Sequence, residues 1–266
     1  MSKINEAVHG IHYMDDISAK DKWINQIHPL AKLIVTISYI LAVVSFDKYD
    51  VAGLAGMSIY LLSIIILGDV PIVHSIKQIK IVLILACIVG IANPFIDKTQ
   101  MWQVGKIVIT GGMLSMISLM LKGIFAVVAS YVLIATTSIE KICYSLRLIR
   151  APKELVTLIL LIYRYVIVLL KEVERISDAY QLRAPNQKGI HIKAWGSLAG
   201  QLLLRSIDRA QVVYESMTLR GYNGEFSAGQ EKESTIKSIC YCILWMGLIL
   251  IFRVIPLFKI VGNILV

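Results

Sequence analysis

The chain has 266 residues, of which 57% are hydrophobic and 17% charged, and its mean hydropathy is +0.71. Soluble domains average about 25% charged residues. Here the apolar residues form long runs with few charges, and most charges lie between the runs. This pattern excludes a disordered, collagen-like or disulfide-scaffold chain and predicts membrane spans joined by water-exposed segments.

Five segments are long and apolar enough to be predicted as membrane spans. A helix needs about 20 residues to cross about 30 Å of hydrocarbon. Lys32 lies near the start of the first span, where a lysine can reach the membrane interface. Lys122, in the middle of the fourth, is expected to snorkel or to find a polar partner, and a structural pairing is favoured over a role with the substrate. The predicted spans are Pro29–Phe46, Val51–Leu67, Ile79–Ala92, Gly111–Thr137 and Ile236–Val261.

The distribution of cations predicts a cytoplasmic N-terminus. Residues 1–27 are polar and do not resemble a secretory signal. With them inside, eight of the nine arginines fall in a cytoplasmic insert at 138–235, and Lys77 falls in the short inside loop 68–78; the positive-inside rule favours this arrangement. The chain then divides into an N-terminal segment 1–27, four spans in 28–137, the insert 138–235 and a fifth span in 236–266.

The insert is predicted to fold into two long helices and one shorter helix. Pro152 opens a segment without Gly or Pro from Lys153 to Ala184, about 48 Å if it is one helix. A second helix is expected after Gly189 and as far as Leu219, and a shorter element between 138 and 151. The first long helix is apolar in its first half and charged in its second.

Both long helices end in similar sequences, Leu182-Arg183-Ala184 and Leu219-Arg220-Gly221. One interpretation is that each arginine complements the helix dipole and the last carbonyl groups. The other is that the two helix ends present arginine's planar fork to carboxylates of a partner.

Four stretches carry a resemblance that covers almost the whole chain. They resemble the transmembrane T component of energy-coupling-factor transporters, in the cobalt-type branch known as CbiQ and related to EcfT. The stretches are His28-Pro-Leu-Ala-Lys-Leu33, Asn93-Pro-Phe95, Tyr163-Arg-Tyr165, and Arg205-Ser-Ile-Asp-Arg-Ala210 with Tyr214-Glu-Ser-Met-Thr-Leu-Arg-Gly-Tyr222.

The resemblance implies where partner subunits bind. In that family two coupling helices end in Ala-Arg-Gly or Ala-Arg-Ser motifs, which dock in grooves on two ATPase subunits. Both arginines are kept here, whereas leucine replaces the first alanine in each motif and Ala184 replaces the last small residue. The implied ATPase-coupling residues are Leu182, Arg183, Ala184, Leu219, Arg220 and Gly221, with supporting contacts from Arg164, Arg205, Asp208 and Arg209.

The resemblance also implies an all-α integral membrane subunit of the cell membrane without catalysis or a cofactor of its own. ATP and Mg²⁺ are expected on the two ATPase subunits, and the solute on an integral membrane substrate-binding component. Cobalt is the favoured solute, and nickel or a vitamin remains an alternative. The chain contains no G-x-x-x-x-G-K-[ST] sequence, so we expect ATP hydrolysis elsewhere.

Other functions fit the sequence less well. An intramembrane enzyme needs convergent ionisable residues within the spans, and a stand-alone carrier more naturally shows repeated halves. Nucleic-acid binding is not expected, because acids interleave with the basic residues of the insert. His9 and His12, with Asp15 and Asp16 nearby, fit a solvated segment better than a metal site.

Two further features have more than one interpretation. Small residues in the spans, such as Gly112 and Ser115, permit close helix packing, either within the chain or toward the substrate-binding subunit. The four cysteines lack the spacing of a zinc or redox site; they are Cys87, Cys143, Cys240 and Cys242.

Overall fold

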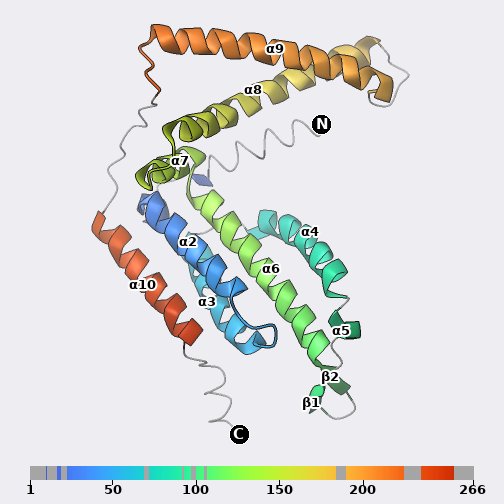
Figure 1. Ribbon diagram of the computed structural model, residues 1–266, viewed down its shortest axis with the longest axis vertical. Coiled ribbons are helices and arrows are strands. Elements are labelled where there is room, and N and C mark those ends of the chain that lie inside the picture. The colour runs from blue at the N-terminus through green and yellow to red at the C-terminus, as the bar shows by residue number, and fades with distance from the viewer. Residues whose placement is uncertain are drawn as a thin grey trace. The chain divides into compact units, whose positions relative to one another are not determined.

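The computed structural model describes residues 10, 17–18, 23–68, 72–91, 93–96, 100–104, 107–183, 190–224 and 235–254 (Figure 1). The chain divides into two compact units. The bundle unit lies within Ile17–Ser138 and Lys232–Val266, and the insert unit contains Ile139–Glu231.

The bundle unit is almost entirely helical. Its elements are the 3-10 turn η1 (Trp23–Gln26), α2 (Pro29–Val44), α3 (Val51–Gly68), α4 (Ile72–Gly90), α5 (Asn93–Ile96), the antiparallel strands β1 (Gln100–Val104) and β2 (Ile107–Thr110), α6 (Gly111–Thr136) and α10 (Thr235–Val254). Hydrophobicity and length make α3, α6 and residues Ile236–Arg253 of α10 candidate spans among the described residues, and α2 is a shorter apolar helix.

The prediction of an all-α membrane protein is confirmed, with two local differences. The predicted third span began at Ile79, whereas α4 begins at Ile72, so part of the expected inside loop is helical. The segment between the third and fourth predicted spans, which the predicted topology places outside, contains α5 and the β1–β2 hairpin. Asp97 and Lys98, predicted to form a solvated turn there, lie outside the described residues.

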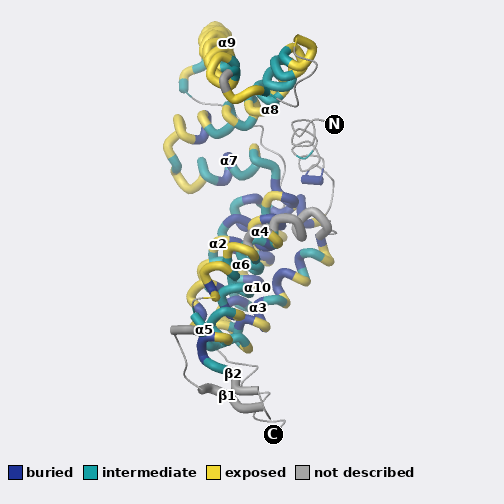
Figure 2. The backbone as a smooth tube through the Cα atoms, turned by 90° about the vertical axis from the view of Figure 1, so that its right-hand side faces the viewer, coloured by how far each residue is buried: buried dark blue, intermediate teal, exposed yellow. Residues whose placement is uncertain are grey.

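Helices α2, α3, α6 and α10 share one apolar core (Figure 2). Tyr39 of α2 stacks on Tyr60 of α3 with ring centroids 4.5 Å apart, and Tyr60 meets the edge of Trp245 of α10 at 4.9 Å. The Tyr39 hydroxyl donates to the carbonyl oxygen of Met57 at 3.1 Å, which satisfies a polar group that lipid could not. These contacts tie three helices together at the core.

Lys32 in the first predicted span and Lys122 in the fourth bind the ends of neighbouring helices. Lys32 is only 4% exposed and donates to the carbonyl oxygen of Thr136, the last residue of α6, at 2.8 Å. The expectation that Lys32 reaches the membrane interface stays a prediction, and the structure adds that the end of α6 supplies its acceptor. Lys122 of α6 donates to the carbonyl oxygens of Val44 and Phe46 at the end of α2, as expected of a structural partner.

A third cation also holds the end of α2. Arg253, in the last turn of α10, donates to the carbonyl oxygen and the hydroxyl of Ser45 at 3.0 and 3.1 Å, and its guanidinium lies 4.9 Å from the centre of the Phe46 ring. The turn between α2 and α3 is thus bound from two other helices. These side chains satisfy carbonyl groups that the end of α2 leaves without a partner within the helix.

Gly112 and Ser115 of α6 pack against Asn93 and Pro94 of α5. A Cβ atom on Gly112 would lie 2.4 Å from the carbonyl oxygen of Asn93, and the Asn93 amide donates to the Ser115 hydroxyl at 3.1 Å. Of the two interpretations of these small residues, packing within the chain is the one that the structure shows. It also gives Asn93-Pro94, one of the stretches behind the resemblance, a structural role.

The insert unit consists of α7 (Ile139–Leu148), α8 (Lys153–Arg183) and α9 (Ile192–Leu219). Helix α8 begins at Lys153 and α9 ends at Leu219, as predicted from Pro152 and Gly221. Helix α7 packs against the start of α8, where Cys143, Ser145 and Val156 are buried. Most of α8 and α9 is exposed or half-buried (Figure 2), so this unit has little core of its own.

Candidate functional site

The first candidate tip is the C-terminal end of α8. Leu182 is 83% exposed, and Arg183, the last residue of the helix, is also exposed. Ala184, the third residue of this predicted motif, lies outside the described residues. The described part of the tip therefore presents an apolar and a cationic side chain together.

The second candidate tip, at the end of α9, has a defined backbone geometry. Gly221 adopts φ 82°, its N–H donates to the carbonyl oxygen of Thr218 at 3.0 Å, and the N–H of Tyr222 donates to that of Met217 at 3.0 Å. This is a Schellman motif, which needs a left-handed residue after the helix and explains the glycine. Arg220 precedes Gly221 and is exposed, and Leu219 is 88% exposed.

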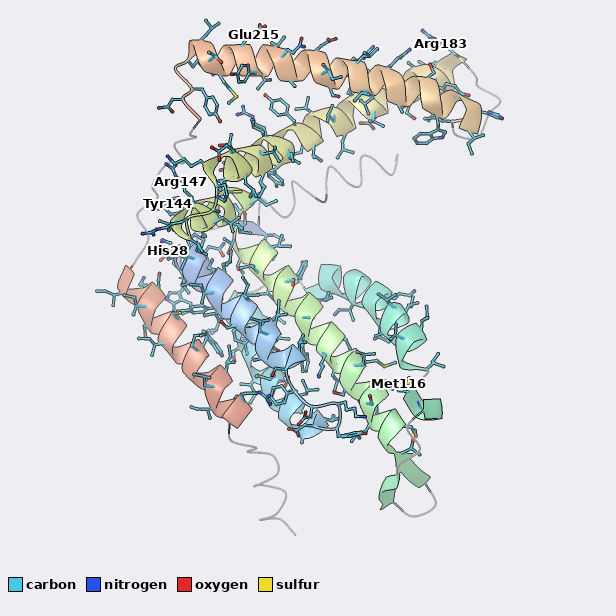
Figure 3. All side chains as sticks on the ribbon, in the orientation of Figure 1. His28, Met116, Tyr144, Arg147, Arg183 and Glu215 are labelled. Carbon is cyan, nitrogen blue, oxygen red and sulfur yellow. The ribbon has the colours of Figure 1, made fainter. Side chains whose placement is uncertain are left out.

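The two tips lie at opposite ends of the α8–α9 pair. Figure 3 shows Arg183 at one end of the pair and Glu215, five residues before Arg220, near the other. The 28 residues of α9 between these ends correspond to a rigid length of about 40 Å. Two separate partner surfaces can therefore be contacted at once.

The four predicted supporting residues have different environments. Arg205 forms an ion pair with Glu172 of α8, and Arg209 lines a groove between the two helices. Arg164 and Asp208 are exposed. Sequence reasoning missed Glu172; its spacing of three residues from Arg175, with which it also pairs, was the available signal.

The groove between α8 and α9 has a volume of about 560 Å³ and mostly apolar walls. It begins beyond the Glu172–Arg205 pair and includes side chains close to the α9 tip. Met217 and Tyr222, which belong to the Schellman motif, are among them. The α8 wall includes Leu161, Tyr165 and Leu169, and the α9 wall includes Ala210, Val213 and Tyr214.

Within the described part of the chain, no group of three or more His, Cys, Asp or Glu residues is arranged to hold a metal ion. His9, His12, Asp15 and Asp16, weighed above as a metal site, lie outside it. All four cysteines are free thiols. Burial, with a smaller contribution from the charge of Glu140, raises the pKa of the Cys143 thiol, so this thiol stays protonated near neutral pH.

The fold and the site together define an all-α membrane protein that carries a largely exposed helical insert with two cationic tips. Residues 20–232 match the family model described as CbiQ, cobalt transport protein. The chain therefore belongs to the CbiQ family.

Three curated archaeal proteins are similar to this chain. Two are described as uncharacterized proteins of Methanocaldococcus jannaschii. One is 33% identical over 45% of this chain and 44% of its own length. The other is 28% identical over 41% of this chain and 38% of its own length. The third, from Methanocorpusculum labreanum, is described as a putative fused cobalt transport protein CbiMQ and is 26% identical over 91% of this chain and 41% of its own length. The chain spans less than half the length of each of these relatives.

Proposed function

We propose that this chain is the energy-coupling membrane component of an ATP-driven cobalt importer. In this proposal two ATPase subunits bind ATP and Mg²⁺ and close on each other, and the chain transmits that closure to a substrate-binding membrane subunit without catalysis of its own. The observation that carries the proposal is the placement of two exposed arginine tips at opposite ends of one stiff helix pair.

The chemistry of the tips fits docking on a protein partner. Each tip combines an exposed leucine with an exposed arginine, which suits a shallow apolar groove that carries a carboxylate at its edge. A guanidinium that binds a carboxylate through two hydrogen bonds can transmit force in both directions. Because the tips are about 40 Å apart and each ends a continuous helix, one tip for each of two ATPase subunits is the simplest arrangement.

The membrane partner is proposed from the fused relative and from the groove. The name of that relative joins CbiM to CbiQ in one chain, and this chain aligns with only 41% of it. We infer that a CbiM-like component binds the cobalt beside this chain. The apolar groove between α8 and α9 is the surface proposed to take an apolar helix of that subunit.

The orientation belongs to the same proposal. With the N-terminus in the cytoplasm, the insert unit lies on the side where ATP is available, and the arginines between 138 and 235 follow the positive-inside rule.

A cysteine label tests this orientation. A cysteine placed at exposed Gln211 of α9 should react with a membrane-impermeant maleimide only after the cells are opened. The four native cysteines are replaced in this experiment.

The test of the docking proposal compares tip variants in the co-expressed complex. Arg183→Ala, Arg220→Ala and the double variant are purified through a tag on this chain, and the retained ATPase and the ⁵⁷Co uptake in vesicles are measured. Loss of charged hydrogen bonds predicts roughly tenfold weaker ATPase retention for each single variant and more for the double. Lys171→Ala, which removes an exposed cation from the middle of α8, is the matched control. Wild-type retention and uptake in the double variant would refute the proposal.

A further inference from the structure

Glu172 joins the two long helices of the insert unit. Its Oε1 atom accepts from Arg205 of α9, and its Oε2 atom accepts from Arg175 of its own helix at 3.3 Å. The side chain of Glu172 is 20% exposed, whereas both arginine side chains are more than half exposed. Both carboxylate oxygens are therefore engaged, one of them across the helix pair.

The ion pair lies at a particular place between α8 and α9. Near the end of α8, the backbone N–H of His191, the residue before α9, donates to the Tyr180 hydroxyl at 3.4 Å. On the other side of the pair the groove begins, with Leu169 three residues before Glu172 and Ser206 directly after Arg205. The Glu172–Arg205 pair thus lies between the His191–Tyr180 contact and the groove.

A half-exposed ion pair contributes little to folding stability, typically less than about 1 kcal/mol. Its geometric effect is larger, because α8 and α9 meet over a short stretch. Arg220 lies 15 residues beyond Arg205, about 22 Å along α9. A rotation of α9 by about 10° at the ion pair would move this tip by about 4 Å, which is more than a docked guanidinium tolerates.

We propose that Glu172 is a positioning residue that fixes the angle between α8 and α9, and with it the spacing of the two arginine tips and the width of the groove. This inference rests on the proposed coupling function. It adds to that function by assigning the angle between α8 and α9 to one interhelical contact. Without that contact the ATPases still bind, but their closure is absorbed by rotation of α9 instead of reaching the membrane partner.

The geometry is tested first on the chain alone. Spin labels at Ala179 of α8 and Gln211 of α9, both exposed positions, report the distance between the helices by pulsed electron resonance. We expect a broader distance distribution in Glu172→Ala and in Arg205→Ala than in the parent, and no further broadening in the double variant. Arg175→Ala, which removes only the contact within α8, should match the parent. An unchanged distribution in Glu172→Ala would overturn the proposal.

The functional consequence is measured in the assembled complex as cobalt taken up per ATP hydrolysed. A pair of this kind favours one geometry by up to about fivefold, so we expect a two- to fivefold fall in Glu172→Ala with normal retention of the ATPases. Unchanged uptake per ATP, despite a broadened distance distribution, would also overturn the inference. If the ATPases fail to bind the parent chain, the proposed function fails, whereas the distance measurement still decides the role of Glu172 in the helix pair.

Discussion

Lys122 of α6 donates a hydrogen bond to the carbonyl oxygen of Val44, the last residue of α2, at 3.1 Å. The contact has a counterpart at the other end of the same two helices, where Lys32 of α2 donates to Thr136, the last residue of α6. Each helix therefore supplies a cation to the C-terminal end of the other. Such an arrangement satisfies terminal carbonyl groups and places a positive charge at the negative end of each helix dipole.

Replacing Lys122 with methionine tests this structural role. The carbonyl oxygens of Val44 and Phe46 then lose a charged donor, and we expect a loss of about 1–3 kcal/mol of stability, measured by unfolding in mixed micelles. Lys122→Arg should recover part of it. A Lys122→Met protein of unchanged stability that no longer transports would show instead that Lys122 acts on the solute.

Gly112→Ala should destabilise the bundle unit. The added methyl group would lie 2.4 Å from the carbonyl oxygen of Asn93 and 2.5 Å from Cα of Pro94, so backbone has to move, at a cost of about 1–3 kcal/mol. The matched control is Gly247→Ala in α10, where a Cβ meets nothing within 4 Å. A thermal shift in detergent that is equal for the two variants would contradict the packing of α6 on α5.

Sequence patterns predicted most helix bounds of this chain because apolar runs and Pro or Gly mark them. Helix α3 begins at Val51, α8 at Lys153 after Pro152, and α9 ends two residues before Gly221. Helix α4 was predicted to begin too late. Lys77 and Lys80 suggested an interface loop, although the segment is helical from Ile72 onward.

The acceptors of Lys32 and Lys122 could not be predicted. The partner of Lys122 is 78 residues away in sequence and the partner of Lys32 is 104 away, and neither acceptor is a side chain that a motif could reveal. Glu172 was missed for a similar reason, because its interhelical partner Arg205 is 33 residues away. The arginines at the tips were predicted because they stand in a repeated local pattern, and their docking role remains a prediction.

At Arg150 the backbone conformation, not a side-chain contact, determines the expected effect of a substitution. Arg150 follows α7 and adopts φ 66°. Its N–H donates to the carbonyl oxygen of Arg147, and the N–H of Ala151 donates to the carbonyl oxygen of Leu146. A non-glycine residue therefore occupies the left-handed position of a Schellman motif. Arg150→Gly should stabilise the insert unit by up to about 1 kcal/mol, and Gly221→Ala, the reverse change at φ 82°, should destabilise it by a similar amount. Shifts of the same sign in both variants, measured as unfolding midpoints, would contradict this.

The buried thiol of Cys143 predicts a pH dependence. Its pKa is raised in the folded chain by burial, so above the unfolded value of about 8.5 the folded state holds more protons than the unfolded state, and stability falls as pH rises. In Cys143→Ala the free energy of unfolding should decline less steeply between pH 8 and 10. The difference in slope should be at most about 1.4 kcal/mol per pH unit, the value for one proton. A decline identical to that of the parent would mean that other groups cause it.

The central claim is that the two tips meet the ATPase subunits, and site-specific photocrosslinking tests it most directly. A photoreactive residue replaces exposed Leu182 or exposed Leu219, and a third sample carries it at Ile243 on the exposed face of α10. The account predicts adducts with an ATPase subunit from positions 182 and 219 and none from position 243. An intact complex in which neither tip position yields an ATPase adduct would contradict it.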